Sequence, residues 1–287
     1  MDFLKSWWRE TLVALLIFSN IFVWISFYQK EATDTLRVYF LNIGQGDAIF
    51  IDSPQHNRIL IDGGRNRRVL SELGRVLPFA DKRIDVVLAT HPDADHIGGL
   101  PEVVSRYKIG AFIESGVESE TLLSAELSRR LDDENISRLL ARRGMVINLG
   151  DGVKLQILFP LVGQDVSNWE TNKASIVAKL VYGDKSFMLT GDSPINIENV
   201  LLNLDPVILD SDVLKAGHHG SRTSTSLTFA EAVSPEYTVI SAGKDNSYGH
   251  PHREVLDILE KVGGQILSTI DKGTIKFEIK NQILKVK

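Results

Sequence analysis

Short apolar runs separated by polar turns occupy most of the chain. Runs rich in Val, Ile, Leu and Phe that end in Gly, Asp or Asn are typical of β-strands. Such runs lie within residues 36–43, 48–52, 57–64, 84–90, 109–115, 154–160, 212–221, 237–243, 266–270, 274–279 and 283–287. The segment 175–192 holds two more, and predicts a β-hairpin that turns at Gly183 and Asp184.

Other segments follow the helical period. Leucines recur every four residues from Leu123 to Leu131, and predict an amphipathic surface helix within Thr121–Arg143, interrupted near Asn135. Further helices are expected from about Leu100 and over 253–263. Strands and helices in two similar halves predict one α/β layered domain rather than two independent units.

The N-terminal segment contains nineteen consecutive uncharged residues, from Thr11 to Gln29. As a helix they would span roughly 28 Å, close to the hydrocarbon thickness of a bilayer. Lys5 and Arg9 precede them, which favours a cytoplasmic N-terminus. The sequence therefore predicts a single-pass anchor in the cell membrane within residues 1–30. The remaining domain, residues 31–287, is expected outside the cytoplasm.

Two other interpretations of this segment are weaker. A cleaved signal peptide has a shorter apolar region and a small-x-small cleavage site, and the following SFYQKEATDT offers no convincing one. A buried core helix is rarely this long and apolar on every face.

Composition and charge narrow the classes of function. The chain is 43% hydrophobic and 24% charged, which is typical of a globular protein. It contains no cysteine, so a disulfide framework and a thiolate metal site are excluded. Its net charge is −5, and the first 30 residues carry +1, so the remainder carries −6. This is not the basic surface of a protein that grips nucleic acid by charge, but an enzyme that meets a polyanion only at a metal is compatible with it.

Six of the seven histidines lie in three short pairs: His91 and His96, His218 and His219, and His250 and His252. Each pair follows a predicted strand, as does an aspartate, Asp192, in the sequence MLTGDS. Taken alone, each pair could be a polar turn or a helix cap. Together they supply the His and carboxylate donors that divalent metals use when cysteine is lacking. One or two divalent ions are therefore expected.

A resemblance to a known family sharpens this expectation. The sequence HPDADHIGG is similar to the HxHxDH signature of the metallo-β-lactamase superfamily. The motifs LNIGQGDAIFID, THPDADHIGG, LTGD, LKAGHHGSRTS and NSYGHP resemble, in order, the C-terminal hydrolase domain of ComEC-like DNA-uptake proteins. The resemblance covers about Leu36 to Lys287 and implies a four-layer αββα sandwich. It stops at the N-terminus, because ComEC proteins carry many membrane spans and this chain is expected to carry one.

The resemblance also implies metal ligands. The residues concerned are His91 and Asp93 for one ion, Asp95 and His96 for a second, Asp192 as a bridge, and His218 or His219 to complete the second site. Asp62 would support the metal loop. Asp93 stands where the signature has a histidine. Asn172 stands at about the position where many members of the superfamily have a further ligand histidine. Oxygen donors shift the preference from Zn²⁺ toward Mn²⁺ or Mg²⁺, and leave the first ion weakly held.

Catalytic roles are expected for Asp95, Asp192, Lys215 and His250. Asp95 or Asp192 would orient the attacking water, and Lys215 could neutralise a phosphate oxygen. Ser221, Arg222, Asn246 and Tyr248 also lie in the matching motifs, and Arg65, Arg67, Arg68 and Arg222 could supply positive charge near the site.

The expected function is a membrane-anchored, metal-dependent phosphodiesterase or nuclease whose substrate could be single-stranded DNA. Two alternatives are a lactamase-type hydrolase of small esters or amides and a non-catalytic module that binds nucleic acid or cell-wall polymers.

Overall fold

The structure is a computed structural model that describes residues 3–28, 34–79 and 81–287, with the side chains of the first helix described for residues 7–23. The chain separates into two units, Met1–Thr33 and Asp34–Lys287. The described residues of the first unit form one helix, α1 (Phe3–Tyr28). The predicted boundary between anchor and domain, after residue 30, falls outside the described residues.

The membrane-spanning helix that the sequence predicts over residues 11–29 coincides largely with α1. Among the residues that the structure describes, no helix has the length and apolar character needed to cross a bilayer. The last part of the predicted span, 24–29, lies outside the residues whose side chains are described.

The second unit contains two β-sheets. The first sheet has eight strands, in the spatial order β15 (Ile283–Val286), β14 (Ile275–Lys280), β1 (Thr35–Phe40), β2 (Ile49–Asp52), β3 (Arg58–Ile61), β4 (Arg83–Ala89), β5 (Lys108–Glu114) and β6 (Ser137–Leu140). The second has seven, in the order β13 (Gln265–Ser268), β12 (Tyr237–Ile240), β11 (Val213–Lys215), β10 (Lys185–Leu189), β9 (Val177–Tyr182), β8 (Lys154–Phe159) and β7 (Val146–Asn148). Neighbouring strands are parallel from β3 to β6 and from β10 to β13, and antiparallel elsewhere.

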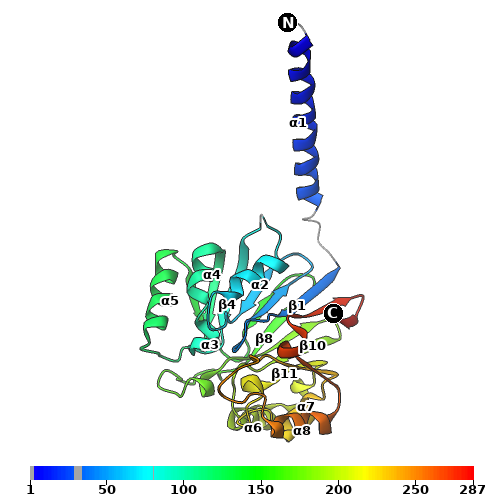
Figure 1. The fold of residues 1–287 in the computed structure, drawn as a ribbon. Coiled ribbons are helices and arrows are strands. Elements are labelled where there is room, and N and C mark those ends of the chain that lie inside the picture. Colours follow the sequence, from blue (N-terminus) through cyan, green and yellow to red (C-terminus); the bar gives the residue numbers. More distant parts are fainter. Residues whose placement is uncertain (1–2, 29–33, 80) are drawn as a thin grey trace. The chain divides into compact units, whose positions relative to one another are not determined.

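Helices cover the outer face of each sheet. On the first sheet lie α2 (Arg68–Val76), α3 (Ala94–Ile97), α4 (Leu100–Arg106) and α5 (Leu122–Asp133). With the second sheet lie α6 (Ile195–Leu204), α7 (Leu227–Val233), α8 (Arg253–Val262) and α9 (Thr269–Lys272), together with the 3₁₀ turns η1 (Asn172–Ala174), η2 (Pro206–Leu209) and η3 (Gly217–Gly220). Figure 1 shows α2, α4 and α5 on one side of the sheets and α6, α7 and α8 on the other. The expected two-sheet α/β sandwich is therefore confirmed.

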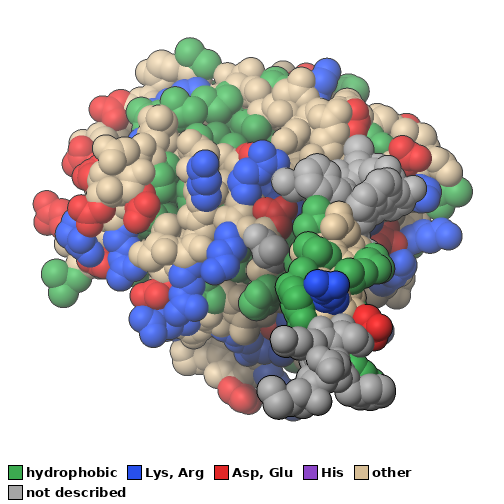
Figure 2. Space-filling model, turned by 90° about the horizontal axis from the view of Figure 1, so that it is seen from above, with side chains coloured by type: hydrophobic (Ala, Val, Ile, Leu, Met, Phe, Trp, Pro, Cys, Tyr) green, Lys and Arg blue, Asp and Glu red, His purple; other side chains and the backbone are tan. Residues whose placement is uncertain are grey.

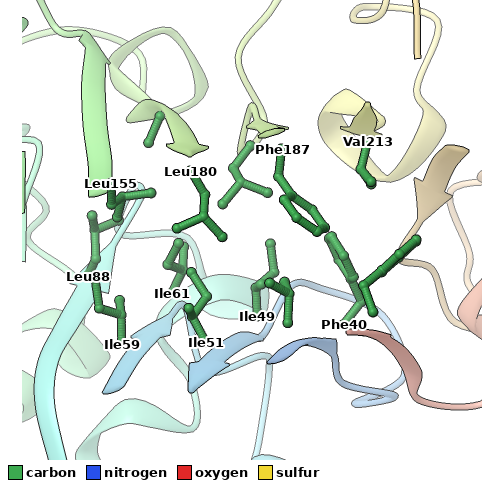
Figure 3. Close-up of a cluster of buried hydrophobic side chains, with 14 of the residues drawn as sticks. Phe40, Ile49, Ile51, Ile59, Ile61, Leu88, Leu155, Leu180, Phe187 and Val213 are labelled. Atoms are coloured by element: carbon green, nitrogen blue, oxygen red, sulfur yellow. The ribbon is translucent and has the colours of Figure 1, made fainter. Parts of the chain in front are cut away.

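The main hydrophobic core lies between the two sheets. Figure 3 shows side chains of the first sheet, such as Phe40, Ile61 and Leu88, facing Leu180 and Phe187 of the second. Alternate residues of each strand point inward, which is why both sheets are rich in β-branched and aromatic residues. Two further cores lie between each sheet and its helices.

One predicted element differs from the structure. The helix expected within Thr121–Arg143 ends at Asp133, and Asn135 turns the chain with a left-handed φ of 52°. The chain then forms β6, whose residues are all exposed at the edge of the sheet. Because no residue of β6 is buried, its sequence has no alternating pattern that would have predicted a strand.

Candidate metal centre

Histidines and aspartates follow strand β4 at the point where it ends. β4 stops at Ala89, and the next loop carries His91 and Asp93 before α3 begins at Ala94. His96 lies on α3. Both histidines are buried, and their ring centroids are 4.0 Å apart. Because β4 lies between two parallel neighbours, this loop emerges at the carboxyl edge of the sheet, where α/β folds commonly present functional groups.

Asp62, just after β3, holds this loop in place. Its Oδ1 accepts a hydrogen bond from the Thr90 backbone N–H (2.7 Å), and its Oδ2 accepts one from Thr90 Oγ1 (2.7 Å). The same Oδ2 lies 2.8 Å from His96 Nδ1. Since the carboxylate accepts, Nδ1 of His96 donates to it, and Nε2 is the atom left to bind a metal once its own proton is lost, the arrangement typical of a metal-binding histidine. That Nε2 lies 3.2 Å from Asp192 Oδ2.

His91 is held in the same way by hydroxyl groups. Its Nδ1 lies 3.0 Å from Thr90 Oγ1 and 3.1 Å from Ser175 Oγ. Ser175 also accepts a hydrogen bond from the backbone N–H of Asp192, at 3.3 Å. One serine therefore ties the His91 ring to the loop of the opposite sheet, and leaves His91 Nε2 buried without a hydrogen-bond partner.

The second sheet contributes Asp192, after β10, and His219, in the η3 turn after β11. His218 and His219 both have left-handed backbone conformations, with φ of 47° and 56°. Such strain costs about 1–3 kcal/mol per residue and is concentrated at functional sites. Here the turn buries the His219 ring, whose Nδ1 donates to the Ser241 carbonyl at 3.0 Å.

The free atoms of these side chains converge. The Nε2 atoms of His91, His96 and His219 and Oδ1 of Asp192 are all buried without a hydrogen-bond partner. Buried polar atoms are normally paired, so unpaired ones that face each other indicate a ligand-binding site. Donor atoms of His91, His96 and Asp192 lie within 4.8 Å of one another, as do those of Asp95, His96 and His219. These nitrogen and oxygen donors fit a divalent metal ion.

Two predicted ligands lie nearer the solvent. The Asp93 side chain is 38% exposed, and its Oδ2 is 3.6 Å from His91 Nε2. The Asp95 side chain is 21% exposed, and its Oδ2 is 3.5 Å from His219 Nε2. Asp93 belongs to none of the groups of three close donors found among the described residues.

His218 and His250 lie beside the centre. Nε2 of His218 is 3.6 Å from Asp192 Oδ2, its Nδ1 is 3.1 Å from Thr223 Oγ1, and its side chain is 25% exposed. The His250 ring centroid is 5.4 Å from that of His218. Nδ1 of His250 is buried without a hydrogen-bond partner. Burial and the neighbouring histidines lower the pKa of His250 to about 4, so its ring is neutral at neutral pH.

Lys215 is fully buried under the centre. Its Nζ lies 2.5 Å from Asp47 Oδ2, 3.9 Å from Asp192 Oδ1 and 3.3 Å from the Gly191 carbonyl. Asp47 is also buried, and its Oδ1 is 3.4 Å from His219 Nδ1. The loop before it approaches α3 closely, because a Cβ on Gly46 would lie 2.0 Å from the Asp95 carbonyl oxygen. The Lys215 ammonium group is therefore paired with the carboxylates of Asp47 and Asp192.

Burial and charge act in opposite directions on the ionisable groups of the centre. Burial raises the pKa of Asp192, but His219 and His96 outweigh it and leave that pKa well below its usual range. Burial lowers the pKa of His96 and His219, but Asp192 and a second carboxylate beside each ring leave both values well above normal. The centre without bound ions is thus a set of carboxylate–imidazolium pairs.

Other residues of the matching motifs shape the surrounding loops. Ser221 Oγ is 3.0 Å from Thr223 Oγ1, the group that holds His218. The Asn246 side chain bonds both backbone groups of His250. Tyr248 and Arg222 are exposed. Asn172 lies in η1, and its Oδ1 is buried without a hydrogen-bond partner.

Three residues of the centre were not predicted as site residues. Asp47 belongs to the motif LNIGQGDAIFID and lies between the two strands predicted over 36–43 and 48–52. Thr90 directly precedes the predicted ligand His91, and this position could have identified it as a residue of the centre. Ser175 lies in a predicted strand, and nothing in its local sequence distinguishes it from other serines.

The fold is a two-sheet α/β sandwich in which histidines and aspartates meet at the ends of strands. This arrangement is typical of a class of metal-dependent hydrolases. The profile of the Metallo-beta-lactamase superfamily matches residues 41–244, and the chain belongs to this superfamily. The family expected from the motifs is therefore confirmed.

Two relatives also match by sequence. ComE operon protein 3 of Bacillus subtilis (strain 168) is 33% identical over 265 residues, which cover 86% of this chain and 33% of that protein. Competence protein ComA of Neisseria gonorrhoeae is 31% identical over 196 residues, or 68% of this chain and 25% of that protein. The chain thus spans a third or less of the length of these two relatives.

A solved structure supports the fold. The metallo-beta-lactamase fold protein YhfI from Bacillus subtilis matches with a TM-score of 0.51 at 12% identity, over 82% of this chain and 96% of that one. At this identity the similarity concerns the fold alone.

Proposed function

We propose that the domain is a metal-dependent phosphodiesterase that cleaves phosphodiester bonds, including those of single-stranded DNA. The observation that carries the proposal is the convergence of three histidines on the Asp192 carboxylate. Nε2 of His96 and of His219 lie 3.2 and 3.4 Å from Asp192 Oδ2, and a donor atom of His91 lies within 4.8 Å of those of His96 and Asp192. The resemblance to ComEC-like DNA-uptake proteins supports DNA as the substrate.

The donor set suits one or two divalent ions, Zn²⁺ or Mn²⁺, with Mg²⁺ a further candidate because carboxylates contribute. His91, His96, His219, Asp95 and Asp192 would hold them, with Asp192 between the two groups of donors. Such an ion supplies Lewis acidity toward a phosphoryl oxygen and activates water for attack. His219 is the stronger candidate ligand of the histidine pair, because its ring is buried and fixed at Nδ1.

The residues at the open side of the centre would handle water and protons. Burial raises the pKa of Asp95, but His219 and His96 leave it well below its usual range, so Asp95 is an ionised acceptor that can orient the attacking water. Burial lowers the pKa of His218, which keeps its ring neutral near pH 7. Because this ring is partly exposed and fixed by Thr223, it can exchange a proton with the reacting phosphate ester.

Lys215 would act through Asp47 and Asp192 rather than by touching the substrate, because its side chain is fully buried. Positive charge for a DNA backbone would come from the exposed residues Arg65, Arg67, Arg68 and Arg222. Elsewhere the charges are mixed, and Figure 2 shows Lys and Arg side chains interspersed with Asp and Glu on the face that it presents.

The location is a further part of the proposal. The uncharged stretch 11–29, preceded by Lys5 and Arg9, supports attachment to the cell membrane with the hydrolase domain outside the cytoplasm. Protease added to intact, wall-free cells should digest the domain and spare a cytoplasmic control protein. Digestion only after lysis would contradict this location.

The experiment that tests the activity uses the full chain, purified in a mild detergent. Bis-p-nitrophenyl phosphate and fluorescent single-stranded DNA are incubated with Mn²⁺, Zn²⁺, Mg²⁺ or EDTA. We expect cleavage of both with an ion, and none in EDTA or in the Asp192→Asn variant. Asp184→Asn makes the same change in the exposed hairpin turn and should retain activity. A folded, metal-loaded protein that cleaves neither compound would contradict the proposed function.

A further inference from the structure

A cavity of about 550 Å³ adjoins the metal centre. It is bounded by the end of β5, the segment that follows it, and helix α5, and His91 and Pro92 form part of its wall. Cavities of about 300–1,000 Å³ are large enough to enclose most of a small organic ligand. The cavity therefore lies within reach of a group attached to a phosphate at the metal centre.

The inner wall of the cavity is apolar. Ile97, Phe112, Leu127 and Leu131 line it and are buried. Phe112 comes from the first sheet and the two leucines from α5, so this wall is part of the helix-on-sheet core. It offers a surface against which a flat apolar group can pack.

Hydroxyl groups surround this wall. Ser115, Ser119, Ser124 and Ser128 all line the cavity. Ser124 Oγ donates to Ser119 Oγ at 3.0 Å, and Ser128 Oγ accepts from Arg138 at 2.7 Å. Hydroxyls both donate and accept, so they match a ligand with polar edges and reject one without them.

The charge of the cavity disfavours a phosphate. Glu114, Glu118 and Glu120 line it, and Arg138 is the one Lys or Arg among the described lining residues. The Arg138 guanidinium is already bound to Glu114, with Nη2 2.9 Å from Oε1. The pair neutralises Glu114 as well as Arg138, so Glu118 and Glu120 leave the cavity with a net negative charge that disfavours an anion. The occupant is therefore uncharged while its phosphate stays at the metal centre.

We infer that this cavity binds the nucleoside next to the phosphate that is cleaved. A nucleoside combines a flat base with polar edges and an uncharged, hydroxylated sugar, which is the chemistry that the cavity complements. The inference rests on the proposed function, because the metal centre must hold the phosphate. It makes the enzyme selective for nucleotide esters over simple phosphodiesters.

The test compares three esters with the same leaving group, cleaved by the full chain with Mn²⁺. They are the p-nitrophenyl phosphodiesters of thymidine at its 5′ oxygen, of thymidine at its 3′ oxygen, and of methanol. We expect kcat/KM for at least one thymidine ester to exceed that for the methyl ester by about tenfold or more. The two thymidine esters cover both directions in which a strand could enter.

Variants on α5 then locate the effect. Ala125 lines the cavity and is exposed, so Ala125→Trp narrows the cavity without removing a buried group. It should reduce the preference for thymidine to about one and leave kcat/KM for the methyl ester unchanged. Leu122→Trp is the matched control, because Leu122 is 91% exposed on the same helix and does not line the cavity. Ala125→Leu replaces Ala125→Trp if the larger side chain prevents folding.

The outcomes separate this inference from the proposed function. Equal cleavage of the methyl and thymidine esters would overturn the inference and leave the proposed phosphodiesterase activity intact. A thymidine preference that persists in Ala125→Trp, as in the Leu122→Trp control, would have the same meaning. Failure to cleave any of the three esters would overturn the proposed function and the inference with it.

Discussion

Lys215 and Asp47 form a buried ion pair that joins the two sheets, with Nζ 2.5 Å from Oδ2. Lys215 ends β11 of the second sheet, and Asp47 lies in the loop between β1 and β2 of the first. Burial raises the pKa of Asp47, but Lys215 and His219 lower it to about 2, so the carboxylate is ionised at neutral pH. The pair fixes the distance between the two halves of the metal centre.

Removing the cation of this pair should destabilise the fold strongly. Lys215→Met leaves Asp47 and Asp192 buried with less compensation, and we expect a loss of about 3–5 kcal/mol in the free energy of unfolding. Lys185→Met removes a more exposed pair, in which Nζ lies 2.9 Å from Asp212 Oδ1. It should cost about 1 kcal/mol or less. Urea unfolding monitored by circular dichroism measures both, and equal losses would contradict the role given to the buried pair.

The two adjacent histidines should have separable effects. His219→Ala removes a buried nitrogen that faces Asp95 and Asp192, and should abolish the rise in melting temperature that Mn²⁺ or Zn²⁺ produces. His218→Ala alters a partly exposed ring and should preserve that rise while lowering kcat by about 10²-fold or more. Differential scanning fluorimetry and steady-state kinetics distinguish them. Loss of the metal effect in His218→Ala alone would reverse the assignment.

The affinity for metal should increase with pH. The pKa of His96 and of His219 is raised in the fold, so the stability from their carboxylate pairs is complete below about pH 6.5. It is lost as the pH rises through the raised values. An ion displaces these protons, and its binding should strengthen by about 1.4 kcal/mol per pH unit for each proton released.

Calorimetric titration of Mn²⁺ in buffers with different ionisation enthalpies counts those protons. In EDTA, the free energy of unfolding should fall as the pH rises above neutral, and this slope should decrease in His219→Gln. Metal binding that releases no proton would show that the rings are already neutral.

Asp62 should control affinity from outside the ligand set. Both carboxylate oxygens of Asp62 accept hydrogen bonds, from Thr90 and from His96. In Asp62→Asn the side-chain amide has only one accepting oxygen, so these hydrogen bonds cannot all be kept. We expect metal affinity to fall by about 10–100-fold while the fold is retained. Asp184→Asn is the control in the hairpin turn. Unchanged affinity in Asp62→Asn would mean that His96 keeps its orientation without the carboxylate.

The sequence predicted the elements whose side-chain pattern is strong and local. The hairpin at Gly183, the buried strand before His91 and the helix at 253–262 all have a clear period and turn residues at their ends. The clusters of histidine that follow strands were also informative, because parallel strands bring their carboxyl ends to one edge. The metal donors that share short motifs could therefore be predicted to meet.

Long-range contacts could not be predicted in this way. Ser175 meets His91 because two sheets pack face to face, and no local period encodes that distance. Lysines are rarely buried, so the complete burial of Lys215 follows only from its partner in the other sheet. The choice between His218 and His219 likewise depends on a strained turn that directs one ring inward.

The place of β14 has a consequence for synthesis of the protein. β1 pairs with β2 on one side and with β14 on the other, from Thr35 opposite Lys280 to Phe40 opposite Ile275. A ribosome therefore completes every candidate metal ligand while β1 still has an open edge. The nascent chain must keep that edge from pairing with other polypeptides until its C-terminal hairpin emerges.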